Sequence, residues 1–187
     1  IPGVMTRGVL DPAGYYYRRL YVDVARSLLV AASLDQVDAL KIVVAGGSQG
    51  GALTIAAAGL ASTVGVRLLG AMPDVPFLCD FRRAVDVATA GPYVEIENYL
   101  KSFRDRTEQT FATLNYIDGV HHAARADCPT LFSVALRDTI CPPSTVFAAY
   151  HAWAHPDRRI EVYEFNNHEG GQSYQVRRQL DWLAERF

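Results

Sequence analysis

Residues 46–50, with the sequence Gly-Gly-Ser-Gln-Gly, constrain the fold more than any other part of the chain. They separate a short β-rich run at 41–45 from small apolar residues at 49–61, which predict a helix lying close to a sheet. A serine on a sharp strand-to-helix turn has a strained backbone, so its neighbours must be small. G-x-S-x-G in this context is typical of a nucleophile elbow. The plainer alternative is a tight turn that happens to contain Ser48.

Two other glycine-rich motifs fit this stretch poorly. A phosphate-binding loop requires Lys followed by Ser or Thr after its glycines, and neither pair follows Gly51. The G-x-G-x-x-G spacing of dinucleotide-binding turns is absent as well. The sequence therefore favours a nucleophilic Ser48. The backbone N–H of Gln49, at the start of the predicted helix, would be one donor to a developing oxyanion.

Strand-like and helix-like segments alternate along the rest of the chain. Apolar spacing near 3.6 residues predicts helices, and short β-rich or alternating runs predict strands. The predicted helices are 15–32, 49–61, 144–153 and 172–187, and the predicted strands are 41–45, 66–71, 130–136 and 160–165. Residues 77–124 show no strand pattern and predict short helices, interpreted as an insertion over the sheet edge. The alternation indicates one α/β domain over residues 1–187, with a mostly parallel sheet flanked by helices.

Two polar residues follow predicted strands in the order that a serine hydrolase requires. Asp138 comes two residues after the strand 130–136, and His168 comes shortly after the strand 160–165. In α/β hydrolases the order along the chain is Ser, Asp, His, with the acid and the base on loops after strands. We therefore predict Ser48 as nucleophile, His168 as general base and Asp138 as the residue that orients the imidazole.

Each of these partners has a plainer alternative when taken alone. Asp138 could be a solvated turn residue or a partner of Arg137, and His168 could be a polar loop residue. Glu169 either supports the imidazole or is merely exposed, and the sequence favours neither. The order and placement of all three predicted triad residues together favour the catalytic interpretation.

Composition excludes several classes of protein. The chain has 187 residues, of which half are hydrophobic, and a net charge of −2, so neither a nucleic-acid-binding face nor a charged tail is indicated. No apolar run approaches the roughly 20 residues that span a bilayer. Cys79, Cys128 and Cys141 form no C-x-x-C pair and no even-numbered framework, which favours a reducing compartment. They are interpreted as small core residues.

The remaining histidines do not predict a metal site. His121 and His122 are adjacent, so their side chains point apart on any regular element. His151 and His155 are four residues apart but lack the glutamate and third ligand of an H-E-x-x-H site. We interpret these four as surface or capping residues and expect neither a metal nor an organic cofactor.

Several longer stretches match one known family. The stretches are Met5–Pro12 with Tyr15–Arg19, Gly46–Gly51, Val75–Leu78, Cys141–Tyr150 and the pair His168-Glu169. With these motifs the sequence resembles carbohydrate esterase family seven, the acetyl xylan esterase and cephalosporin-C deacetylase family. Gln49 and the His168-Glu169 pair are its most diagnostic residues. The resemblance covers all 187 residues and corresponds to the C-terminal part of the family's chain.

The resemblance implies an α/β-hydrolase fold with Ser48, Asp138 and His168 as triad, and Phe77 and Ile140 as candidate walls of the acyl pocket. It implies removal of acetyl groups from acetylated xylan, xylo-oligosaccharides and cephalosporin C through an acetyl-serine intermediate. It also implies cytoplasmic homohexamers, with no nucleic acid or membrane as partner.

The family pattern has an upstream half that this sequence does not show. That half contains the first strands of the sheet, an Arg-Gly-Gln motif and a tyrosine that completes the oxyanion hole, and the bare Ile1 suggests a chain that begins inside a larger protein. Two alternatives stay open. One is another hydrolase of this fold, a lipase or a peptidase, although the mixed polarity of 77–124 does not favour a lipase lid. The other is an inactive fragment that acts only in assembly.

Overall fold

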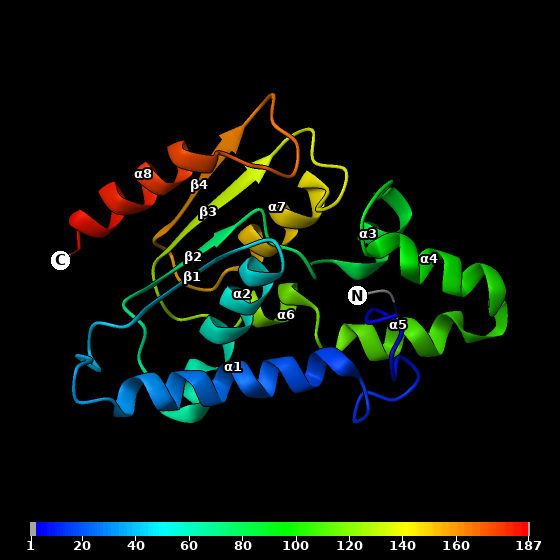
Figure 1. The fold of residues 1–187 in the computed structure, drawn as a ribbon, viewed down its shortest axis with the longest axis horizontal. Coiled ribbons are helices and arrows are strands. Elements are labelled where there is room, and N and C mark those ends of the chain that lie inside the picture. The colour runs from blue at the N-terminus through cyan, green and yellow to red at the C-terminus, as the bar shows by residue number, and fades with distance from the viewer. Residues whose placement is uncertain (1–2, 187) are drawn as a thin grey trace.

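Within residues 3–186, four short strands alternate with helices and form one parallel sheet in the order β1-β2-β3-β4. This computed structural model describes residues 3–186. The strands are β1 (Val43–Gly47), β2 (Gly70–Asp74), β3 (Thr130–Ala135) and β4 (Arg158–Tyr163). Each pairs in parallel with the next, so all four carboxyl ends meet at one edge of the sheet (Figure 1). The predicted α/β class with a parallel sheet is confirmed.

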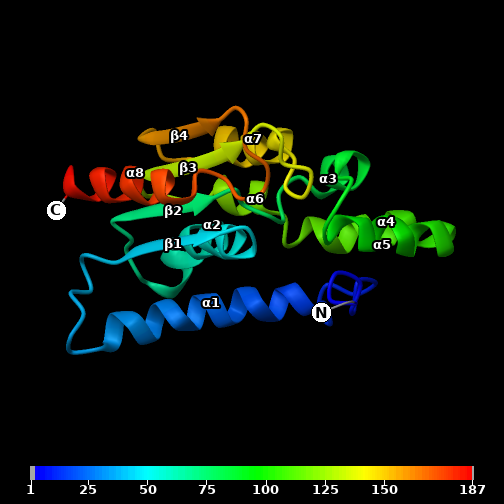
Figure 2. The same ribbon diagram turned by 45° about the horizontal axis from the view of Figure 1, so that its top comes forward.

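Helices lie on both faces of the sheet, because the side chains of a parallel sheet are apolar on both sides. Phe132 and Val134 of β3 face α2 (Gln49–Ala61), α6 (Gly119–Ala123) and α7 (Pro143–Ala152), and α1 (Tyr16–Ser33) packs against α2. Leu131 faces the other way, towards Trp182 of α8 (Gln172–Ala184) (Figure 2). None of the helices formed by residues 3–186 is long and apolar enough to cross a membrane.

The main core lies between the sheet and the layer of α2, α6 and α7. Its buried members come from every element of that layer and include Leu28, Ile42, Ile55, Ala57, Ala58, Phe132, Val134, Val146 and Trp153. Small residues let α2 approach closely. A Cβ added to Gly59 would lie 2.4 Å from the carbonyl oxygen of His122 in α6, so this contact between helices requires glycine.

Between β2 and β3 the chain leaves the sheet through α3 (Phe81–Val87), α4 (Tyr93–Ser102) and α5 (Thr107–Asn115), then returns through α6. The described part of the chain also contains two 3-10 turns, η1 (Ser62–Val64) and η2 (Arg104–Arg106). Asp118 connects the start of α3 to the start of α6. Its carboxylate accepts the backbone N–H groups of Asp80, Phe81 and Val120 at 2.8–2.9 Å. The short helices predicted for 77–124 are therefore present, with α3–α5 extending away from the sheet (Figure 1).

The predicted position of the second strand is wrong. The apolar run 66–71 was expected to pair, but the ladder begins at Gly70 and ends at Asp74. Proline lacks a ladder donor and usually marks a strand end, yet Pro73 lies inside β2 opposite Gly46. Val66 and Leu68 are buried in the core beside the ladder. The other predicted elements end within about three residues of the observed ones; residue 187, the predicted end of the last helix, lies outside the described residues.

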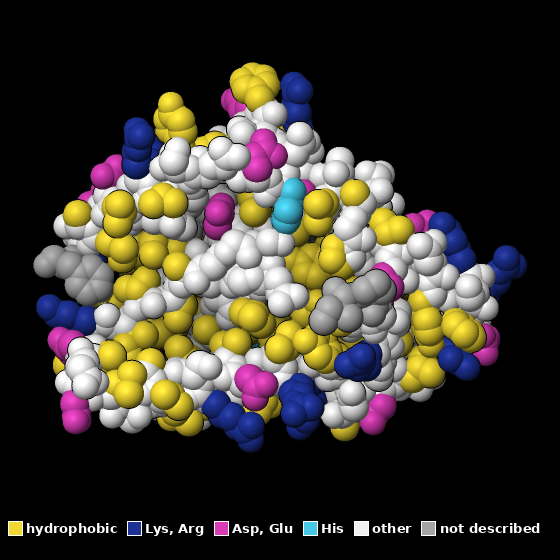
Figure 3. All heavy atoms as spheres, in the orientation of Figure 1, with side chains coloured by type: hydrophobic (Ala, Val, Ile, Leu, Met, Phe, Trp, Pro, Cys, Tyr) yellow, Lys and Arg dark blue, Asp and Glu magenta, His cyan; other side chains and the backbone are white. Residues whose placement is uncertain are grey.

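One side of β1 is open. Among residues 3–186, β1 hydrogen-bonds only to β2, and its Ala45 and Gly47 are exposed. A groove of about 400 Å³ follows this edge between β1, α1 and α2. Figure 3 shows hydrophobic side chains gathered in the same region, between α8 and α1. An apolar strand edge with free backbone groups is a template for pairing with a further strand.

Candidate active site

Ser48 occupies a sharp turn between β1 and α2. Its φ of 54° and ψ of −115° belong to a strained backbone conformation of the kind that clusters at active sites. The Ser48 N–H donates to the carbonyl oxygen of Asp74 at 2.9 Å, and the Ser48 carbonyl accepts the N–H of Phe77 at 3.0 Å. A Cβ at Gly46 would lie 2.6 Å from the backbone of Gly50, so the turn requires glycine there. These contacts explain the elbow motif physically.

His168 lies between the other two predicted triad residues. Its Nε2 is 2.8 Å from Ser48 Oγ, and its Nδ1 is 2.8 Å from Asp138 Oδ2. Because a carboxylate only accepts, Nδ1 carries the proton, and Nε2 is left to accept from the serine hydroxyl. The three residues follow β1, β3 and β4, at the edge of the sheet where the carboxyl ends of the strands meet.

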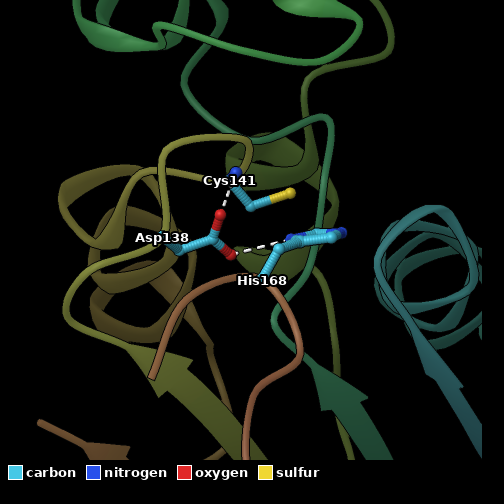
Figure 4. Close-up of side chains that lie close together, drawn as sticks. All are labelled: Asp138, Cys141 and His168. Carbon is cyan, nitrogen blue, oxygen red and sulfur yellow. Dashed lines mark hydrogen bonds and ion pairs between the residues drawn. The ribbon is translucent and has the colours of Figure 1, made fainter. Parts of the chain in front are cut away.

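Asp138 is held rigidly. Its side chain is fully buried, and Oδ1 accepts the backbone N–H groups of Ile140 at 2.8 Å and Cys141 at 2.9 Å. Oδ2 is then directed at the imidazole, as Figure 4 shows for Asp138, Cys141 and His168. The alternatives of a solvated turn residue or a partner of Arg137 do not fit this geometry.

The first turn of α2 leaves an N–H available beside Ser48. Gln49 is the first residue of the helix, and an N–H there has no acceptor within the helix. The Gln49 side chain is held by the Tyr17 hydroxyl, which donates to Oε1 at 3.3 Å. Burial, aided by Tyr16 and Glu95, raises the pKa of Tyr17 to about 12, so this hydroxyl keeps its proton. The helix N-terminus and this N–H together favour negative charge at the serine oxygen.

Phe77 and Ile140, expected to wall an acyl pocket, both lie beside the triad. The Phe77 N–H contacts Ser48, and the Ile140 N–H contacts Asp138. Phe77 is buried against Tyr93, with ring centroids 4.4 Å apart, and Ile140 is half-buried against the same apolar cluster. Both residues therefore contact the predicted triad through their backbones.

Asp138, Cys141 and His168 also place three potential metal-ligand atoms within 4.8 Å of one another. Their chemistry does not fit a metal, because Asp138 already accepts from Ile140, Cys141 and His168. Burial, and then the charge of Asp138, raise the pKa of the Cys141 thiol well above its usual range, so the thiolate that a metal needs is disfavoured. We therefore interpret Asp138 and His168 as a hydrogen-bonded pair beside the Cys141 thiol, and not as metal ligands.

Glu169 does not contact the imidazole ring through a hydrogen bond. Its exposed carboxylate accepts from the Asn166 side chain at 3.1 Å and from the Asn167 N–H at 3.2 Å. Hydrogen bonds from its own N–H, from Asn167 and from Asn166 lower the pKa of Glu169. Glu169 thus orders the turn that presents His168.

Sequence reasoning missed Asp74. This half-buried carboxyl ends β2 next to the serine turn, and Ser133 Oγ donates to its Oδ1. Burial raises the pKa of Asp74, although Ser133 and His168 oppose that shift. An acid at the end of a strand adjacent to the nucleophile strand was the available signal, but the predicted strand ended three residues before Asp74.

A parallel sheet that presents Ser48, Asp138 and His168 in this order and geometry defines an α/β-hydrolase fold. The chain belongs to the acetyl xylan esterase (AXE1) family, whose model matches residues 1–186. The resemblance inferred from the sequence motifs is thereby confirmed.

Individual relatives agree with this assignment. The chain is 30% identical to acetyl esterase Axe7A of Xylanibacter ruminicola over 89% of its own length and 36% of that protein. Its structure matches an acetyl xylan esterase from Paenibacillus sp. R4 (TM-score 0.93, 43% identity) and acetyl xylan esterase 1 from Thermoanaerobacterium sp. JW/SL YS485 (TM-score 0.90, 30% identity). All of this chain is covered, against 58% and 59% of those chains, so it spans less than two thirds of its relatives. Dipeptidyl peptidase 4 of Porphyromonas gingivalis, at 17% identity and a TM-score of 0.70, shares the fold.

Proposed function

We propose that this chain carries the catalytic triad of a serine esterase that removes acetyl groups from acetylated xylan and xylo-oligosaccharides. The observation that supports this most is the position of His168, whose two nitrogens each lie 2.8 Å from a partner, Ser48 and Asp138. Membership of the acetyl xylan esterase family adds the class of substrate.

In the proposed mechanism, Ser48 Oγ attacks the carbonyl carbon of the acetyl ester while His168 Nε2 takes the hydroxyl proton. The carbonyl oxygen becomes an oxyanion, which accepts the Gln49 N–H at the start of α2. The ester C–O bond then breaks, the sugar alkoxide receives the proton from His168, and acetyl-Ser48 remains. Water, deprotonated by His168, attacks that intermediate and releases acetate and free Ser48.

Ser48→Ala in the complete natural protein tests this mechanism. The variant should lose nearly all turnover of an acetyl ester and keep its fold, because Ser48 contributes a hydroxyl and little packing. In the unaltered protein, rapid quenching followed by mass spectrometry should show one acetyl group on the peptide that contains Ser48. Wild-type turnover in Ser48→Ala would exclude both the mechanism and the triad.

The finer proposal concerns acyl size. If Phe77 and Ile140 wall the acyl pocket, Ile140→Ala should raise the rate with butyryl esters relative to acetyl esters, because it would shorten one wall of that pocket. Leu100→Ala, which truncates a half-buried residue at the far end of α4, is the matched control and should leave the ratio unchanged. An unchanged ratio in Ile140→Ala would show that Ile140 only packs. Deacetylation of cephalosporin C by the same pocket is part of this proposal and is measured in the same assay.

Location and assembly complete the proposal. Cys79, Cys128 and Cys141 are free and buried, which suits a reducing, cytoplasmic compartment. By resemblance, the complete protein would be a homohexamer. Fractionation of cells and mass photometry of the purified protein test the two statements separately.

A further inference from the structure

Asp74 takes no part in the proposed proton transfers, although it lies directly beside Ser48. It is the last residue of β2, and its carbonyl oxygen holds the Ser48 N–H at 2.9 Å. Its carboxyl group is near both sides of the catalytic arrangement. A Cβ at Gly47, just before Ser48, would be 3.7 Å from Asp74 Oδ2. A Cβ at Gly170, two residues after His168, would be 3.4 Å from Oδ1.

The hydrogen bonds of Ser133 show that the Asp74 carboxyl acts as an acceptor. Ser133 is fully buried on β3, and its Oγ accepts the Val75 N–H at 3.0 Å. Its single hydroxyl proton is directed at Asp74 Oδ1. Asp74 therefore acts as an acceptor at Oδ1, which suits an ionised carboxylate. A neutral serine and one charged acceptor make a strong, charge-assisted hydrogen bond.

The loop that carries His168 passes close to Asp74. Gly170 has a φ of +56° and is buried, and a side chain there would contact Val75 at 3.2 Å as well as Asp74. Hence β2, β3 and the His168 loop meet at the Asp74 carboxyl.

The charge of Asp74 provides a second connection to His168, in addition to the packing at Gly170. Asp74 and His168 interact electrostatically, and this interaction lowers the pKa of Asp74 against the rise caused by burial. The other titratable side chain facing Asp74 is Tyr163 on β4, whose pKa burial, Glu161 and Asp74 raise to about 12, so it stays neutral. Two further carboxylates act on His168, the hydrogen-bonded Asp138 and the exposed Glu169.

We propose that Asp74 is a positioning residue for the esterase reaction: with Ser133 it supports the His168 loop against the serine turn, and its negative charge stabilises the imidazolium that forms during attack. Asp138 orients the ring through its bond to Nδ1, and Asp74 supplies a second charge from beneath the loop. This inference rests on the proposed function, because imidazolium forms only if His168 takes the Ser48 proton.

Asp74→Asn in the complete natural protein tests it, since the amide oxygen can still accept from Ser133 while the charge is removed. The expected loss in kcat is about tenfold or more, given the strength of charge pairs in a partly buried site. KM for a small acetyl ester should stay unchanged if Asp74 acts only through His168, and this separates positioning from substrate binding. The acid limb of the kcat/KM profile should move to lower pH, because the lost charge favoured the protonated imidazole. Glu164→Gln, which removes an exposed carboxylate directly after β4 that has no part in the site, should change kcat by less than about twofold.

A second variant covers the case in which Asp74→Asn does not fold. Ser133→Ala removes the donor that lowers the pKa of Asp74, so Asp74 takes up its proton at higher pH. The kcat of this variant should therefore begin to fall at a higher pH than in the unaltered protein. A folded Asp74→Asn with wild-type kcat and acid limb, or a Ser133→Ala profile identical to wild type, would overturn the inference. Ser48→Ala distinguishes the proposed esterase mechanism from the proposed role of Asp74. If Ser48→Ala abolishes turnover while Asp74→Asn and Ser133→Ala behave as wild type, only the role of Asp74 is wrong.

Discussion

Asp138→Asn changes one carboxylate oxygen into an NH₂ group and alters the shape of the side chain very little. The structure decides which oxygen changes. Oδ1 accepts two backbone N–H groups, from Ile140 and Cys141, whereas Oδ2 accepts one, from His168 Nδ1. An NH₂ group at Oδ1 would face two donors and leave both buried without an acceptor, at about 1–3 kcal/mol each. The amide therefore places its oxygen at Oδ1 and its NH₂ group towards His168.

That orientation of the amide changes the tautomer of the His168 imidazole. Nδ1 must now accept from the amide, so the ring proton moves to Nε2 and points at Ser48 Oγ. The ring can no longer take the serine proton. A triad with the wrong tautomer loses about 10⁴ in kcat, which corresponds to about 5 kcal/mol of transition-state stabilisation. Stability should change little, because both backbone donors keep their acceptor.

Steady-state hydrolysis of an activated acetyl ester near neutral pH measures the effect in the complete natural protein, beside a denaturant curve. Glu169→Gln is the matched control, since it also neutralises a carboxylate close to His168 but leaves the ring's hydrogen bonds intact. A folded Asp138→Asn that keeps more than about a tenth of wild-type kcat would refute the reasoning about the tautomer.

Three further predictions concern the scaffold. Gly46→Ala places a methyl group 2.6 Å from the Gly50 backbone and should cost about 1–3 kcal/mol in a denaturant curve, with loss of turnover, whereas Gly50→Ala, with open space at its Cβ, should be neutral. Burial lowers the pKa of His122 from 6.5 to about 4, so the unfolded chain binds its proton first and stability falls as pH drops through this range. His122→Phe, which keeps a ring against Tyr21, should remove up to about 3 kcal/mol of that acid sensitivity, measured by denaturation at pH 7 and about pH 4. A polypeptide of residues 1–187 alone should aggregate or unfold without a sharp transition because the Val43–Gly47 edge is open, and a monomer with two-state unfolding in light scattering and denaturant curves would contradict this.

Local features of the chain predicted more of the structure than features that depend on neighbouring strands. The serine turn was predictable because steric rules at a strand-to-helix turn are local, and Gly46 satisfies them two residues before Ser48. Asp138 and His168 could be placed because loops after parallel strands share one edge of the sheet. Pro73 misled the prediction of β2, since a proline's lack of an N–H is visible in sequence but its tolerance between β1 and β3 depends on neighbouring strands.

His122 illustrates the limit of residue type as a guide. It was interpreted with its neighbour His121 as a surface or capping residue. His121 is exposed, but the His122 ring is half-buried against Tyr21 with centroids 5.0 Å apart, and its Nδ1 has no hydrogen-bond partner among the described residues. Two adjacent histidines differ because α6 turns one towards α1 and the other towards solvent.

The sequence by itself determined the class of fold, the serine turn and the order of the three proposed triad residues, because each depends on local sterics or on periodicity along the chain. Only the tertiary structure decided how these residues meet. It brought His168 within 2.8 Å of Ser48 across 120 positions, and it placed Asp74 beneath the His168 loop. Such contacts depend on which strands are neighbours, on where β2 begins and on the close approach that glycines permit. Those are properties of packing between distant segments, and no pattern within one segment contains them.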